Sequence, residues 1–209
     1  MSANEDHLDP GVRANLRLTA LVGLAMIVPL LVVTLSGLSF DQLWRVHYFA
    51  GFLLVPLLLL KLATTGYRMA AYYLGNRRYR RAGPPAHLLR ILAPVLVIST
   101  VVLFLSGIVM WLENSRLQPW STLHTDAAVV FCVTASVHLL AYLRRASSES
   151  AAELRRRTRS GVRLRGALGA TLVVGVVLAV VTIAPSQLPA RPRHLRAEFG
   201  RITAPAPGG

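Results

Sequence analysis

Five blocks of about twenty apolar residues dominate this chain, and each is long enough to cross a lipid bilayer as an α-helix. The blocks cover residues 18–38, 44–71, 88–112, 120–143 and 166–184. A bilayer admits only helices and closed β-barrels, and no block alternates with the two-residue period of a barrel strand. The sequence therefore predicts an all-α integral membrane protein.

Composition supports the same class. Hydrophobic residues make up 54% of the 209 positions, and the mean hydropathy is +0.50. A soluble domain is rarely so apolar, and here the excess is confined to the blocks. We expect the first block to remain in the mature protein, because it is too long for the core of a signal peptide and lacks an A-x-A cleavage site.

The net charge of +14 raises the question of nucleic acid, but the arginines follow a membrane pattern. They cluster after the second and fourth blocks, at Arg77, Arg78, Arg80, Arg81, Arg144, Arg145, Arg155, Arg156, Arg157, Arg159, Arg163 and Arg165. This is the positive-inside pattern, and it places the N-terminus and both basic loops in the cytoplasm. Attraction to anionic lipid headgroups accounts for the charge, so we expect no nucleic-acid partner.

These signals divide the chain into five parts. We expect a cytoplasmic tail (1–16), a four-helix transmembrane domain (17–143), a basic cytoplasmic loop (144–165), a fifth transmembrane helix (166–184) and a disordered extracytoplasmic tail (185–209). The fifth helix contains Gly, Ala and Val but no chemically active side chain, so we expect it to lie at the periphery of the functional site.

The most informative pattern is a repeated spacing of ionisable residues within the apolar blocks. His47 and Lys61 lie fourteen positions apart in the second block, and His124 and His138 lie fourteen apart in the fourth. Fourteen helical residues are just under four turns, so both members of a pair face the same way, roughly 21 Å apart. Ionisable groups within a membrane are costly and usually functional.

The pairs also match in depth. The second and fourth blocks cross the bilayer in the same direction, and His47 and His124 each follow an interfacial tryptophan by three or four residues. We call these two residues the outer level and the other two, Lys61 and His138, the inner level. Two facing histidines at one depth suit the axial ligation of a haem iron.

These stretches resemble the b-type membrane cytochromes of bacteria, whose four-helix bundle carries a His-x13-His pair on each of two parallel helices. The resemblance covers roughly residues 18–143 and implies that His47 and His124 ligate one haem b. His124 and His138 match the pattern, whereas Lys61 stands where the family has histidine. The inner level is therefore without haem, or has His138 and Lys61 as an unusual pair, or has His138 alone.

Lys61 is the only lysine in the chain. It can extend along the helix to the inner headgroups, as long cationic side chains do. Alternatively it is a haem ligand, a partner of a haem propionate, or a proton-handling group beside a quinone. Ligation requires the neutral amine.

Three further residues are candidates for the cofactor site. Arg45 and Arg116 lie at the outer face and suit haem propionates, although each also suits the membrane interface. Gly51, one turn after His47, leaves space for a flat macrocycle.

The sequence favours a haem b electron-transfer subunit of the bacterial inner (cytoplasmic) membrane, which exchanges electrons with quinone and with a partner oxidoreductase. It contains no flavin or nucleotide fingerprint and no CxxC cluster, so we expect a component of an enzyme and assign no catalytic residue. One haem is expected and a second is an option. The alternatives are a stand-alone transmembrane reductase, which needs two haems, and a haem-free transporter or membrane scaffold.

Overall fold

A computed structural model describes residues 9–81, 87–114, 116, 118–155 and 159–186. Helices account for 91% of this part of the chain, which contains no strand. The prediction of an all-α protein is confirmed. Half of the predicted N-terminal tail and nearly all of the predicted C-terminal tail lie outside the described residues.

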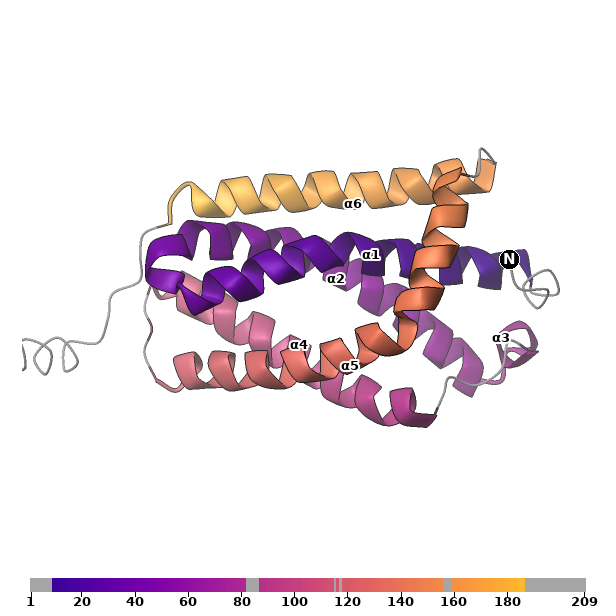
Figure 1. The fold of residues 1–209 in the computed structure, drawn as a ribbon, viewed down its shortest axis with the longest axis horizontal. Helices are drawn as coiled ribbons and strands as arrows, with labels where there is room; N and C mark the ends of the chain where they lie inside the picture. Colours follow the sequence, from indigo (N-terminus) through magenta and orange to yellow (C-terminus); the bar gives the residue numbers. More distant parts are fainter. Residues whose placement is uncertain (1–8, 82–86, 115, 117, 156–158, 187–209) are drawn as a thin grey trace, which may run out of the picture. The chain divides into compact units, whose positions relative to one another are not determined.

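The helices follow the apolar blocks (Figure 1). They are α1 (Pro10–Leu38), α2 (Phe40–Tyr73), α3 (Arg77–Arg81), α4 (His87–Leu112), α5 (Trp120–Arg155) and α6 (Arg159–Ile183). Within the described ranges, α1, α2, α4, α5 and α6 each contain a segment long and apolar enough to cross a membrane. This supports a multi-pass membrane protein, as the apolar blocks predict.

Helices α1, α2, α5 and α6 extend beyond their predicted bounds, and α6 begins at Arg159, within the predicted basic loop. Residues 10–16, which we assigned to the N-terminal tail, belong to α1, because Asp9 caps the helix and Pro10 occupies its first turn, where proline is favoured. Helix α5 continues to Arg155, well into the predicted basic loop. Its extension is rich in Ala, Glu, Leu and Arg, which are strong helix formers.

The chain forms two compact units. Of the described residues, those before residue 91 and those from 137 to 185 form unit 1, and those from 91 to 136 together with Ser186 form unit 2. In unit 1, α1 and α2 form a hairpin interrupted only at Ser39, and α6 packs along α2 (Figure 1). Unit 2 contains a second hairpin, formed by α4 and the first part of α5.

Helix α6 lies directly on the helix that carries His47 and Lys61. A Cβ at Gly175 would stand 2.8 Å from the carbonyl oxygen of Leu53 and 3.2 Å from Cγ of Pro56. Only glycine lets the two backbones approach this closely, and Ala179, one turn further along α6, is fully buried. The fifth spanning helix is therefore an integral part of unit 1.

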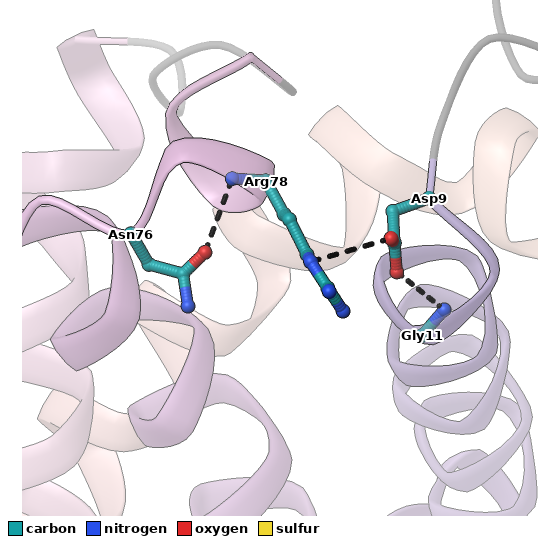
Figure 2. Close-up of polar contacts among 4 residues, drawn as sticks. All are labelled: Asp9, Gly11, Asn76 and Arg78. Carbon is teal, nitrogen blue, oxygen red and sulfur yellow. Dashed lines mark hydrogen bonds and ion pairs between the residues drawn. The ribbon is translucent and has the colours of Figure 1, made fainter.

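The short helix α3 is attached to the start of α1. The Asp9 carboxylate accepts a hydrogen bond from the Gly11 amide at 2.9 Å and lies 3.5 Å from Nε of Arg78 (Figure 2). The Arg78 amide in turn donates to the side-chain oxygen of Asn76 at 3.1 Å (Figure 2). Asn76 directly precedes α3, so this hydrogen bond lies at the start of the helix. One carboxylate therefore caps α1 and also contacts α3.

Apolar packing fixes the same corner. Tyr79 of α3 is 7% exposed and lies in a cluster with Val12 and Leu16 of α1 and Ala71 of α2. Its ring meets that of Tyr67 edge-on, with centroids 5.6 Å apart. Burial, reinforced by Tyr67, raises the pKa of Tyr79 above its ordinary value, so the phenol is neutral at physiological pH.

Candidate functional site: two oriented imidazoles

His47 is held against the preceding helix of its hairpin. Its Nδ1 lies 2.9 Å from the carbonyl oxygen of Val33 in α1. The Phe40 ring meets the imidazole edge-on at a centroid distance of 5.3 Å. The side chain is half-buried. A backbone carbonyl on one side and an aromatic ring on another therefore restrict its rotation.

Gly37 provides the space for this imidazole. A Cβ at Gly37 would lie 3.2 Å from Cε1 and 3.3 Å from Nδ1 of His47. Such contacts are tighter than ordinary van der Waals distances, so a larger residue would displace the ring from the Val33 carbonyl. Glycine at this position brings the imidazole close to the α1 backbone.

The same arrangement occurs in unit 2. Nδ1 of His124 lies 2.9 Å from the carbonyl oxygen of Leu103 in α4 and 3.3 Å from Oγ of Ser106. A Cβ at Gly107 would lie 3.0 Å from Cε1 and 3.3 Å from Nδ1 of His124. Each hairpin thus places one histidine against a carbonyl and a glycine of its first helix.

The match extends to the register of the first helices. Val33 and Leu103, whose carbonyls accept these hydrogen bonds, each precede the glycine by four residues. Each glycine ends a Leu-Ser-Gly triplet, at 35–37 and 105–107. The serine hydroxyls donate to carbonyls one turn earlier in their own helices. Neither glycine was among the predicted site residues, although the repeated triplet is a visible signal in the sequence.

The second helices match as well. Small or apolar side chains are buried three, seven and ten residues after each histidine: Ala50, Leu54 and Leu57 in α2, and Ala127, Phe131 and Thr134 in α5. The two hairpins therefore bury corresponding faces of α2 and α5. Equivalent packing explains why equivalent histidines receive equivalent backbone partners.

The carbonyl contacts determine the tautomer of both imidazoles. A carbonyl oxygen only accepts hydrogen bonds, so Nδ1 of His47 and of His124 must carry the proton. In a neutral imidazole the lone pair then resides on Nε2. Histidines that bind metals are commonly oriented in this way, with one ring nitrogen donating to a carbonyl and the other reserved for the metal.

The inner level differs from the outer level. Nζ of Lys61 donates to the carbonyl oxygen of Thr19 in α1 at 2.6 Å, and a Cβ at Gly23 would lie 2.8 Å from the same nitrogen. His138 is half-buried, and the charges of Lys61 and Arg68 act on it. Lys61 thus contacts the backbone of the neighbouring helix.

The structure also describes the surroundings of the three supporting candidates, Arg45, Arg116 and Gly51. The Arg45 side chain is exposed, and its guanidinium carbon lies 5.1 Å from the centroid of the Trp44 ring, an arrangement typical of a membrane interface. Arg116 lies in the segment that connects α4 to α5, and its side chain is half-buried. A Cβ at Gly51 would meet only Val33, at 4.0 Å, so packing within unit 1 does not require glycine there.

Among the described residues, no three His, Cys, Asp or Glu side chains gather into a metal-binding group. Axial ligation of haem iron uses only one or two protein side chains, so it does not depend on such a cluster. No protein-family model, no curated protein and no solved structure matches this chain.

Proposed function

We propose that this chain is a haem b electron-transfer subunit that passes electrons between quinone in the bilayer and a partner oxidoreductase. The observation that carries the proposal is the repeated half-site. In each hairpin, an imidazole is oriented by a carbonyl of the preceding helix and packs against a glycine. Two such histidines, His47 and His124, are the axial ligands implied by the resemblance to the b-type cytochromes.

The two imidazoles, His47 and His124, are suitable ligands for haem b. In both imidazoles Nδ1 carries a proton, so the neutral form of each has its lone pair on Nε2, as a haem ligand must. Haem b, when bound, supplies a one-electron redox couple. The chain itself orients the ligands through the carbonyls of Val33 and Leu103.

The rest of the proposal comes from the sequence. The positive-inside pattern supports a cytoplasmic N-terminus, and we propose the bacterial inner membrane as the location because the resemblance is to bacterial cytochromes. The sequence has no motif of a flavin, nucleotide or iron–sulfur domain, so a partner protein must provide the chemistry of the second substrate. Quinone, which is dissolved in the bilayer, is the other exchange partner.

The test is haem content per polypeptide of protein purified in detergent, from reduced-minus-oxidised absorbance spectra. We expect haem b in the wild type and its loss in His47→Ala and in His124→Ala. The double variant should lose no more than either single variant, because both residues serve one iron. His194→Ala, outside the transmembrane blocks, is the matched control and should retain haem.

Circular dichroism of each variant separates loss of ligand from loss of fold. A wild-type protein that is helical and binds no haem would refute the proposal and favour the haem-free transporter or scaffold. Haem retained at the wild-type level in both single variants would place the cofactor elsewhere in the chain.

A further inference from the structure

The α1–α2 hairpin repeats its half-site once, fourteen residues away on each helix. His47 contacts the carbonyl of Val33 and lies against Gly37; Lys61 contacts the carbonyl of Thr19 and lies against Gly23. From Val33 to Thr19, from Gly37 to Gly23 and from His47 to Lys61 the step is fourteen residues. The backbone and the glycine are thus repeated, and only the side chain on α2 has changed.

This change removes the atom that a metal would bind. An imidazole reaches the carbonyl with Nδ1 and keeps a second nitrogen on the other side of the ring. Lysine has one nitrogen, and Nζ of Lys61 is at hydrogen-bond distance, 2.6 Å, from the Thr19 carbonyl and would be 2.8 Å from a Cβ at Gly23. It therefore occupies the place of Nδ1 of the histidine and not that of Nε2. As an ammonium it has three N–H donors and no lone pair.

The sequence of α4 also departs from the outer-level pattern. Fourteen residues before Gly107, the helix carries Ala93, so the glycine of the unit 2 hairpin is not repeated. At the inner level, the charges of Lys61 and Arg68 act on His138 within unit 1. A cationic neighbour opposes the accumulation of further positive charge, as on an iron centre.

The geometry points to a haem-free inner level, in which Lys61 joins α2 to α1 through the Thr19 carbonyl in place of a haem ligand. This inference rests on the proposed function for the outer level and deepens it. Held only by His47 and His124, haem b would supply its redox couple on one side of the bilayer. The quinone and the partner protein must then both exchange electrons near the outer face, and the chain is not a transmembrane reductase.

The experiment measures haem per polypeptide and the unfolding temperature of the full chain in detergent, for the wild type, His138→Ala and Lys61→Met. Methionine matches the length of lysine without its N–H groups. We expect one haem in all three proteins. Lys61→Met should unfold a few degrees lower, because the Thr19 carbonyl loses a hydrogen bond from a charged donor. Leu59→Met, at an exposed position of α2, is the control and should leave the unfolding temperature unchanged.

Two haems in the wild type, with one lost in His138→Ala or Lys61→Met, would overturn the inference and leave the proposed function intact. An unchanged unfolding temperature in Lys61→Met would overturn the role of Lys61 in joining the helices. A wild type without haem would refute the proposed function, and the unfolding temperature of Lys61→Met would still decide whether Lys61 joins α1 and α2.

Discussion

The imidazole of His124 lies so close to Gly107 that a Cβ on the glycine would stand 3.0 Å from Cε1 of the ring. The corresponding distance between Gly37 and His47 is 3.2 Å. In both hairpins the glycine of the first helix decides how near the histidine of the second helix comes to a backbone carbonyl. The orientation of each histidine therefore depends on a residue with no side chain.

We predict that Gly107→Ala and Gly37→Ala each lower haem content, with the larger loss for Gly107→Ala, where the contact is shorter. The added methyl group displaces the imidazole from its carbonyl and disturbs the orientation of Nε2. Haem per polypeptide, measured from the absorbance of the purified variants, checks this prediction.

Gly66→Ala and Gly169→Ala are matched controls, because a Cβ at either position meets nothing within 4 Å. Both should keep wild-type haem content and gain a little stability, since alanine has the higher helix propensity. Equal haem loss in the controls and in the two test variants would contradict the role of the imidazole contact.

We predict that added imidazole restores haem binding to His47→Gly and to His124→Gly. Truncation to glycine leaves space beside the carbonyl that a free imidazole can enter. Recovery of a substantial part of the wild-type haem absorbance, followed as imidazole is titrated, is the expected result. A histidine that only stabilises packing would give variants whose haem content does not respond to imidazole.

Gly175→Ala is expected to weaken the packing of α6 on α2. The new Cβ would lie 2.8 Å from the Leu53 carbonyl oxygen, and a backbone atom cannot move aside as a flexible side chain can. We expect a loss of about 1–3 kcal/mol in the free energy of unfolding, typical of overpacking a close contact. Thermal unfolding in detergent measures it. Gly166→Ala in the same helix meets open space, so a similar loss there would refute the explanation.

Asp9→Ala should destabilise the corner formed by α1 and α3. Loss of the N-cap costs about 1 kcal/mol, and the ion pair with the largely exposed Arg78 contributes little. Asp9→Ser keeps a capping oxygen and should recover most of the loss, whereas Arg78→Gln should be close to wild type. If Arg78→Gln were as destabilising as Asp9→Ala, the ion pair and not the cap would be the main interaction. Chemical unfolding in detergent compares the three variants.

The sequence alone was sufficient for the fold class and for the outer-level candidates. Continuous apolar blocks leave a bilayer protein no choice but helices, so five spanning segments follow from composition and length. The fourteen-residue spacing likewise selects His47, His124, His138 and Lys61, because helical periodicity places each pair on one face. The roles proposed for Arg45, Arg116 and Gly51 stay predictions.

Only the tertiary structure decided what each of these side chains contacts. Spacing along one helix does not predict which residues of a neighbouring helix lie beside it. His47 and Lys61 contact the carbonyls of Val33 and Thr19 in α1, and these partners are known only from the structure. The same reason explains why α6, which has no chemically active side chain, proved to pack backbone to backbone on α2 through Gly175. Helical periodicity is a local property, whereas the close approach of two helices depends on which residues of the second helix face a glycine of the first.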